Sequence, residues 1–370
     1  MTRARRPRVL LIGPYPPPDT GVTMPFKLFC DWLERERKDD LEIGIFRTHT
    51  DRKPLVKFFY PHVFCRLLGV LFAMPLRALA ADRVVIFGSN RFVSVVGGPM
   101  TVLLRIFSKP VSLRVFGGAF ELYFQNRSAP MQWLIKKMFG LCDRIVAEPE
   151  LSAIALRAVW PRQIRGVRNY RVPINDVVRR DADPLRVRFI FVGNIRGLKG
   201  CGELIAAFSE MRRRLNAEHP DIRVTLDLFG PHQSTGSDPV AGIDQARQDP
   251  DITFHGPVAN EVLRAAYLQS DVFVYPTYWP TEGHSGAVIE ALFCGLPVLA
   301  SDWRANTEVV HDGVNGVICK PKDAADLADC MLRLTTDAQL RERLSTGALR
   351  EAKQYDAAVV CPELAEALGL

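Results

Sequence analysis

Two glutamates and a run of small residues in the segment 279–301 (WPTEGHSGAVIEALFCGLPVLAS) have the types and spacing of a site for sugar hydroxyls and phosphate. Glu290 lies four residues after Gly286, one turn into an expected helix, so its carboxylate can reach the loop that carries Glu282. A glutamate buried in this apolar run for purely structural reasons would be costly without a partner. Small residues leave backbone N–H groups uncovered at the expected helix start, where the helix dipole favours an anion: Gly283, Ser285, Gly286 and Ala287.

Two cations follow the first apolar run of the second half, in the segment 189–200 (FIFVGNIRGLKG). The Arg196 guanidinium can bind two phosphate oxygens at once, and Lys199 supplies a compact charge; each charged hydrogen bond contributes about 1.5–3 kcal/mol. A helix with 3.6-residue periodicity is expected directly afterwards. The segment therefore predicts a diphosphate site, with an ordinary cationic surface loop as the alternative.

The first half offers a weaker motif, the proline-rich loop 13–22 (GPYPPPDTGV) before an expected helix. Thr20 and Gly21 would lie at the N-terminus of that helix, where an anion is favoured. A proline-stiffened structural turn is equally consistent with this loop. The dinucleotide pattern Gly-x-Gly-x-x-Gly is absent.

Short apolar runs alternate with helical periodicity along the chain, which predicts an α/β fold built on parallel sheets. We expect strands in the first half at 9–12, 42–46, 83–87, 111–116 and 144–147, with helices at 24–37 and 129–140. The strands expected in the second half are 188–192, 223–229, 252–254, 272–275, 297–300 and 316–319. The segment 171–185 lacks periodicity and is the expected linker. Ligands bind beyond the carboxyl ends of parallel strands, where both polar motifs are expected.

Length and charge indicate two domains with different partners. A chain of 370 residues exceeds what one hydrophobic core usually supports, and its ordinary composition excludes disordered, collagen-like and disulfide-scaffold proteins. The net charge of +7 combines +16 over residues 1–180 with −9 over residues 181–370. An anionic partner is therefore expected for the first half, and two solvated surfaces of unlike sign are the alternative.

Neither a signal peptide nor a membrane span is expected. The apolar run 9–12 is too short for a signal core, and cations and prolines interrupt the apolar segment 55–80. That segment would lie on a membrane surface or form a buried helix flanked by cations. The eight cysteines are scattered, which predicts reduced thiols in a cytoplasmic protein.

Together these motifs resemble the retaining glycosyltransferases of family 4 (glycosyl transferases group 1), which have the GT-B fold of two facing Rossmann-like domains with a cleft between them. The likeness is strongest over 186–335: the glycine-lysine motif 193–200, FHGPV at 254–258, the pair Glu282 and Glu290, Glu308, and DGVNG at 312–316. It is looser before residue 180, where it rests on the loop 17–21, on CDRIVA at 142–147 and on Asn169.

The resemblance implies an acceptor-binding domain at 1–180, a donor-binding domain at 181–350 and a C-terminal helix within 351–370 that packs back on the first domain. It implies retaining, metal-independent transfer of a sugar from a UDP-, GDP- or similar nucleotide-sugar to a glycan or lipid-linked hydroxyl, in bacterial cell-surface polysaccharide or lipopolysaccharide synthesis. No cofactor is expected, because the nucleotide-sugar is a substrate. We expect a cytoplasmic enzyme, peripheral at the inner face of an anionic membrane through its basic half, with no nucleic-acid partner.

The resemblance also assigns roles to residues. Glu282 would contact hydroxyls of the transferred sugar, while Lys199 and Arg196 neutralise the leaving diphosphate; these three are the expected catalytic residues. Glu290 would hold the donor ribose. The remaining expected donor-binding residues are Gly193, Asn194, His284, Ser285, Gly286 and Ala287.

Two departures from the family pattern bear on catalysis. Asn194 stands where the family commonly has arginine, so Arg196 is expected to supply that charge. The family's His-Gly pair near the reacting centre is replaced by RVFGGAF at 114–120. Arg114 or the amides of Gly117 and Gly118 are expected in its place, with Thr20 and Gly21 completing the phosphate and acceptor loops.

Two other interpretations remain open. The missing histidine favours an inactive glycosyltransferase-like binding subunit, whereas two retained carboxylates and Lys199 count against it. An epimerase or hydrolase on the same fold would need an acid/base group that the first half lacks. No metal site is expected, because the Asp-x-Asp sequence formed by Asp181 and Asp183 lies in the linker.

Overall fold

The computed structural model describes residues 5–17, 20–48, 76–160, 164–174, 183, 185–233 and 236–370. The chain forms two compact units: unit 1 is Met1–Val172 with Asp356–Leu370, and unit 2 is Pro173–Tyr355. The first crossing between the units therefore falls within the predicted linker, and the chain returns at Asp356 rather than near residue 351. Most of the segment 55–80 and Asp181 lie outside the described residues.

Unit 1 is built on a parallel sheet of six strands in the order β2-β1-β3-β4-β5-β6. The strands are β1 (Arg8–Gly13), β2 (Glu42–Arg47), β3 (Arg83–Ser89), β4 (Val111–Phe116), β5 (Arg144–Ala147) and β6 (Ile164–Gly166). Its helices are α1 (Thr23–Glu36), α3 (Asn90–Phe92), α4 (Gly98–Ile106), α5 (Phe120–Gln125), α6 (Ala129–Gly140), α7 (Glu150–Val159) and α15 (Ala357–Leu368). Helix α3 continues into α4 through the wider turn Val93–Gly97.

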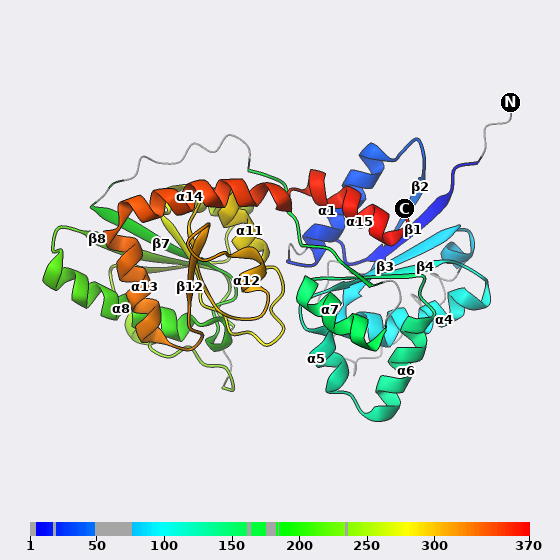
Figure 1. Cartoon of the computed structure of the whole chain (residues 1–370), viewed down its shortest axis with the longest axis horizontal. Coiled ribbons are helices and arrows are strands. Elements are labelled where there is room, and N and C mark those ends of the chain that lie inside the picture. The colour runs from blue at the N-terminus through cyan, green and yellow to red at the C-terminus, as the bar shows by residue number, and fades with distance from the viewer. Residues whose placement is uncertain are drawn as a thin grey trace. The chain divides into compact units, whose positions relative to one another are not determined.

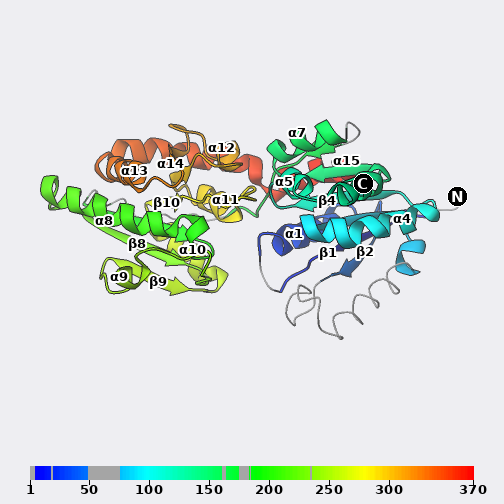
Figure 2. The same ribbon diagram turned by 90° about the horizontal axis from the view of Figure 1, so that it is seen from below.

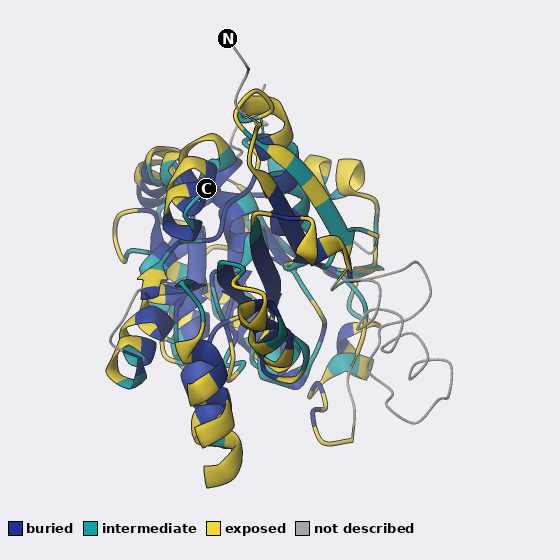
Figure 3. Cartoon of the chain, turned by 90° about the vertical axis from the view of Figure 1, so that its right-hand side faces the viewer, coloured by how far each residue is buried: buried dark blue, intermediate teal, exposed yellow. Residues whose placement is uncertain are grey.

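Apolar layers lie on both faces of this sheet. One layer includes α1 and α15, and the other includes α4, α5 and α6, as Figure 1 shows. Strands β1, β3, β4 and β5 are largely buried, the edge strand β2 is partly exposed, and the helices carry exposed residues on their outer sides (Figure 3). Such two-sided burial explains why the strands of a parallel sheet read as continuous apolar runs.

Unit 2 repeats the design with a parallel sheet in the order β12-β11-β10-β7-β8-β9. The strands are β7 (Arg186–Val192), β8 (Arg223–Phe229), β9 (Ile252–Gly256), β10 (Val272–Tyr275), β11 (Val298–Ser301) and β12 (Gly316–Cys319). The helices are α8 (Cys201–Glu218), α9 (Ile243–Ala246), α10 (Asn260–Gln269), α11 (Gly286–Phe293), α12 (Asn306–Val309), α13 (Ala324–Thr336) and α14 (Ala338–Ala352), with short 3-10 turns at Gly197–Lys199 and Lys353–Tyr355. Figure 2 shows α8 and α13 side by side, joined by an ion pair between Arg214 and Asp329.

The prediction of an α/β fold with two parallel sheets is confirmed, and each predicted strand is present. Several bounds agree with the prediction, among them Val111–Phe116, Arg223–Phe229 and Val272–Tyr275. Strand β6 was not predicted, because three residues are too few to show a pattern. Among the described cysteines, Cys30, Cys201, Cys294, Cys319 and Cys361 are buried.

The last helix, α15, belongs to unit 1. It contributes Val360, Leu364 and Leu368 to the apolar cluster that includes α1. The buried Ser112 hydroxyl of β4 donates to the Leu368 carbonyl at 2.9 Å. The chain thus leaves unit 1 to form unit 2 and then returns, and helix α15 completes one of the two helical layers of unit 1.

Within the described ranges, we find no helix that is both long enough and apolar enough to cross a bilayer.

The close approach of α14 to the loop before β12 provides a test of the packing. A Cβ added to Gly347 would lie 1.8 Å from the Val314 carbonyl oxygen, whereas a Cβ added to Gly140 at the end of α6 would meet nothing within 4 Å. We expect Gly347→Ala to lower the free energy of unfolding by about 1–3 kcal/mol, the cost of overpacking. The matched variant Gly140→Ala should leave it unchanged or raise it by up to about 1 kcal/mol. Denaturant unfolding measures both, and equal stabilities would contradict this packing.

Candidate functional site

The candidate site lies in unit 2, at the carboxyl ends of β7 and β10. These strands are neighbours in the sheet although a long stretch of chain separates them. From β7 the chain continues to its neighbour β8 on one side, and from β10 it continues to its neighbour β11 on the other side. Open α/β sheets form their ligand crevices at the point where the strand order reverses in this way. Lys199 follows β7 and Glu282 follows β10, so the sheet order brings the two motifs together.

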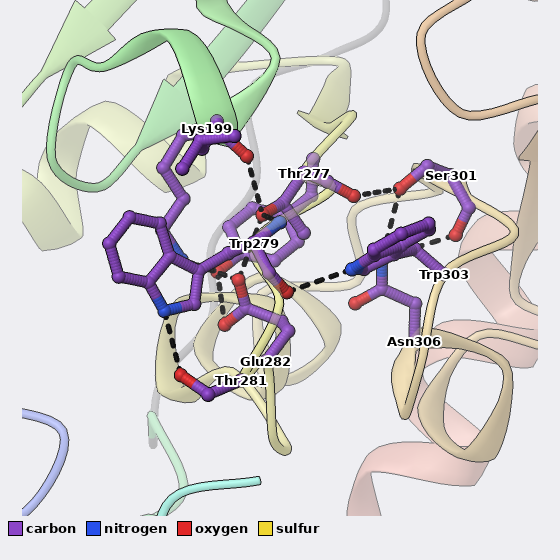
Figure 4. A network of polar contacts seen from close by, with 10 residues as sticks. Lys199, Thr277, Trp279, Thr281, Glu282, Ser301, Trp303 and Asn306 are labelled. Atoms are coloured by element: carbon purple, nitrogen blue, oxygen red, sulfur yellow. Dashed lines mark hydrogen bonds and ion pairs between the residues drawn. The ribbon is translucent and has the colours of Figure 1, made fainter. Parts of the chain in front are cut away.

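Lys199 and Glu282 form a buried ion pair, drawn in Figure 4. The Lys199 ammonium lies 2.5 Å from Glu282 Oε2, which also accepts a hydrogen bond from the Thr277 hydroxyl at 2.8 Å. The Tyr275 hydroxyl donates to Glu282 Oε1 at 3.1 Å and accepts from Lys199 at 3.0 Å. Only 7% of Glu282 is exposed, so these three partners replace most of the water around its carboxylate.

This environment fixes the protonation of the cation and the phenol. Burial alone would lower the pKa of Lys199, but Tyr275 and Glu282 outweigh it, and the pKa lies above its usual value. Burial raises the pKa of Tyr275 to about 12. Both groups therefore keep their protons at neutral pH, and Lys199 remains a full positive charge at the site.

Gly200 allows Lys199 to reach this position. Its φ is +73°, and an added Cβ would lie 2.2 Å from the Pro276 carbonyl oxygen at the end of β10. No larger residue fits this approach without moving backbone. The glycine that follows the lysine in this motif is thus required because the turn after β7 packs closely on the segment after β10.

Arg196 is oriented by a residue that the sequence did not reveal. Its Nε donates to Asp238 Oδ2 at 2.7 Å, and the second oxygen of Asp238 accepts from the Leu198 amide at 2.7 Å. The guanidinium carbon lies 4.7 Å from the centroid of the Trp279 ring, a cation–π distance. Arg196 is thus held beside the loop of Glu282. Of the two other predicted residues of this loop, Gly193 donates its amide to the Phe229 carbonyl and Asn194 is exposed.

Helix α11 begins at Gly286, as its small residues predicted. Ser285 at the N-cap makes no side-chain capping hydrogen bond, so its hydroxyl leaves the first-turn N–H groups to other acceptors. Glu290 is half-buried, one turn further on, and Tyr267 of α10 directs its hydroxyl to the Glu290 carboxylate at 3.5 Å. Ala287 accepts from the same hydroxyl through its carbonyl at 3.4 Å.

His284 is buried and turns toward α12. Its Nε2 lies 2.9 Å from the Glu308 carboxylate, and its ring packs edge-on against Tyr355. The Tyr355 hydroxyl donates to the Glu308 carbonyl at 3.1 Å. The histidine therefore anchors the start of α11 to α12 and links Glu308 of the family motif to the site.

The loop after β11 supports the loop that carries Glu282 (Figure 4). The Ser301 hydroxyl donates to the Thr277 carbonyl at 2.5 Å, and the Trp303 indole donates to the Trp279 carbonyl at 2.8 Å. Asn306 in turn donates to the Ser301 carbonyl at 3.1 Å. Two side chains, Ser301 and Trp303, thus fix the backbone of the loop that carries Glu282, and Asn306 holds Ser301 in place.

The predicted residues of the first half lie in unit 1. The Thr20 hydroxyl accepts from the Thr23 amide at 3.1 Å, which caps the first turn of α1. A Cβ at Gly21 would meet nothing within 4 Å, so packing alone does not require glycine there. Gly117 has a φ of +85°, and the Gly118 carbonyl accepts from Asn90 at 3.5 Å.

The expectation that Arg114 contacts a ligand needs correction. Its side chain is fully buried in β4, where it donates to the Glu148 carboxylate at 3.1 Å and to the Val167 carbonyl at 3.0 Å. Burial lowers the pKa of Arg114, and Glu148 opposes this shift. A guanidinium held inside the core of unit 1 stabilises the fold and cannot replace the missing histidine.

The described residues contain no group of three or more acidic, histidine or cysteine side chains that could hold a metal ion. The most important partners that the sequence analysis missed are Tyr275, Thr277, Asp238 and Tyr267. Tyr275 and Thr277 carried one usable signal, since polar hydroxyls at the end of an apolar strand require partners.

Comparisons with known proteins bear on the family and on the fold. Residues 186–337 match the family model described as "Glycosyl transferases group 1". The D-inositol 3-phosphate glycosyltransferase of Stackebrandtia nassauensis is 31% identical over 185 residues, which are 48% of this chain and 40% of that protein. The corresponding protein of Paenarthrobacter aurescens is 25% identical over 244 residues, 65% of this chain and 55% of that protein. The chain thus matches only about half the length of these relatives.

Solved structures resemble the whole chain in fold. Sucrose-phosphate synthase from Thermosynechococcus elongatus has a TM-score of 0.73 at 18% identity, covering 98% of both chains. Anabaena HepE, solved with UDP-glucose, has a TM-score of 0.67 at 17% identity, covering 98% of this chain and 99% of its own. The family model covers the unit that holds Lys199, Glu282 and Glu290. Residues 186–337 therefore match the glycosyl transferases group 1 family, and the chain as a whole has the GT-B fold.

Proposed function

We propose that the protein transfers a sugar from a nucleotide-diphosphate sugar to a hydroxyl of a glycan or lipid-linked acceptor, with retention at the anomeric carbon and without a metal ion or cofactor. The observation that carries this proposal is the buried pair of Lys199 and Glu282 beside the N-terminus of α11. A full positive charge and open helix amides at one sheet edge suit a diphosphate.

Different residues of the site bind different parts of the donor. Lys199 and Arg196 neutralise the diphosphate, with amides of Ser285, Gly286 and Ala287 as further donors. Glu290 binds the ribose hydroxyls, and Tyr267 orients its carboxylate. The Glu282 carboxylate, already bound to Lys199, Tyr275 and Thr277, fixes the cation and presents its one remaining lone pair, on Oε1, to a hydroxyl of the sugar.

The chemistry follows from a leaving group that is itself a base. The acceptor oxygen bonds to the anomeric carbon on the face from which the diphosphate departs, and the departing phosphate oxygen takes the acceptor proton. Catalysis then rests on positioning the reactants and on stabilising the negative charge that develops on the phosphate. Lys199 and Arg196 provide this stabilisation. Since a cation already stands there, the scheme needs no metal ion.

The acceptor side is proposed for unit 1. Its excess of positive charge suits an anionic membrane surface or a lipid-diphosphate-linked glycan, as in bacterial cell-surface polysaccharide or lipopolysaccharide synthesis. HepE has been solved with UDP-glucose, which makes UDP-glucose the first donor to test.

Glu290→Gln and Lys199→Ala should each reduce transfer by at least about 100-fold, the scale of one lost charged transition-state contact. Tyr267→Phe keeps the Glu290 charge and loses only its orientation, so we expect a loss of about tenfold or less. Steady-state kcat/KM for nucleotide-sugar consumption measures each effect. The matched control is Glu261→Gln, an exposed carboxylate at the start of α10. Near-normal transfer by both Glu290→Gln and Lys199→Ala, with unchanged melting temperatures, would refute the site.

A screen of UDP-, GDP- and ADP-sugars by thermal shift selects the donor, because a bound ligand raises the melting temperature. With that donor and a hydroxyl acceptor, we expect transfer to continue in excess EDTA and NMR to report an unchanged anomeric configuration. Inversion or loss of activity in EDTA would overturn the proposed mechanism. Donor turnover without acceptor would instead indicate an epimerase or hydrolase. Donor binding without any turnover would indicate a binding subunit.

A further inference from the structure

The outer sides of α4 and α6 in unit 1 expose large apolar side chains. Ile106 is 71% exposed and Trp133 is 61% exposed, values unusual for side chains of this size. Val102 and Ile106 lie four residues apart in α4 and so share one side of that helix, and Val95 lies in the wider turn that precedes it. The full set of exposed large apolar residues on and next to these two helices is Val95, Val102, Ile106, Phe107, Met131, Trp133, Leu134 and Leu141.

The two helices present these residues together. Helices α4 and α6 pack against each other, with Gly98 of α4 against Met138 of α6. The Cys142 sulfur after α6 lies 3.9 Å from the Thr101 hydroxyl of α4. Both helices cover the same face of the sheet of unit 1 (Figure 1). We call the outer side of α4 and α6, with the residues named above, the α4–α6 face.

The exposed charged side chains of the segment that forms the α4–α6 face are cations. Between residues 90 and 142 the only acidic residue is Glu121, which is buried. Exposed cations in the same stretch are Arg91, Arg105, Arg127, Lys136 and Lys137. Asp143, directly after the stretch, pairs with Arg105. A surface that combines apolar side chains with cations and lacks exposed carboxylates over so long a stretch needs a partner that is both apolar and anionic.

We propose that the α4–α6 face docks on a membrane that contains anionic phospholipid. Trp133 and Ile106 would enter the boundary between headgroups and acyl chains, where tryptophan side chains are favoured. Lys136 and Lys137 would extend to the lipid phosphates; the Lys137 ammonium lies 5.9 Å from the Trp133 ring, so cation and indole project together. Apolar insertion and electrostatic attraction are both needed for stable surface binding.

This inference deepens the proposed function, since it names the surface by which unit 1 would approach a lipid-linked acceptor. It can be tested without donor or acceptor, so failure of sugar transfer and failure of docking are distinguishable. A membrane is favoured over a second protein copy because a self-complementary interface would place these cations against one another.

The test is flotation of the full chain with vesicles of phosphatidylcholine alone or with 30% phosphatidylglycerol. We expect binding to the anionic vesicles, weakened in high salt, and little binding to phosphatidylcholine. The double variants Ile106→Ser with Trp133→Ser, and Lys136→Glu with Lys137→Glu, should each reduce the partition coefficient at least about tenfold.

The control combines one substitution of each kind on unit 2, as Val262→Ser with Arg350→Glu, at two exposed residues. It should bind vesicles like the unchanged protein, and melting temperatures should show that all variants fold. Equal vesicle binding by the face variants and the control would overturn the proposal, as would absence of binding to anionic vesicles. A concentration-dependent dimer that the face variants abolish would assign the α4–α6 face to a second copy instead.

Discussion

The ion pair of Lys199 and Glu282 is the interaction on which the site depends. A carboxylate and an ammonium removed from water are costly unless they meet each other and further hydrogen bonds, and removing one partner typically costs about 3–5 kcal/mol. Here the turn after β7 and the segment after β10 each supply one partner. Thr277 donates to the same carboxylate oxygen as Lys199, and Tyr275 donates to the other. The pair therefore fixes where the two loops lie relative to each other and where α11 begins.

Other contacts extend this constraint outward from the pair. Asp238 orients Arg196, while Ser301 and Trp303 hold the backbone of the loop that carries Glu282. His284 ties the start of α11 to α12. Most of the cations and carboxylates at the site are thus already hydrogen-bonded within unit 2. Side chains that are already held in place lose little conformational entropy when a charged ligand binds.

Most strands could be predicted because they are buried on both faces of their sheet, which leaves an apolar run in the sequence; the edge strands β2 and β9 are only partly buried. The motif residues Lys199, Glu282 and Glu290 could also be named from the sequence. Their mutual contacts could not, because the pairing of β7 with β10 is a property of strand order. Arg114 shows the opposite error: a cation at the start of the segment 114–120 was expected to contact a ligand, but Glu148, far along the chain, holds it inside the core. Partners contributed by distant segments leave no local pattern.

The most direct test of the central claim is the affinity for a nucleoside diphosphate after both members of the pair are made neutral. In the double variant Lys199→Met with Glu282→Gln neither charge is left buried alone, so the fold should survive. Isothermal titration calorimetry with UDP, or with the base selected by thermal shift, should then show at least about a tenfold loss of affinity at an unchanged melting temperature, the scale of one charged hydrogen bond. Affinity equal to that of the unchanged protein would contradict the account, because the pair would then stabilise the fold without serving the ligand.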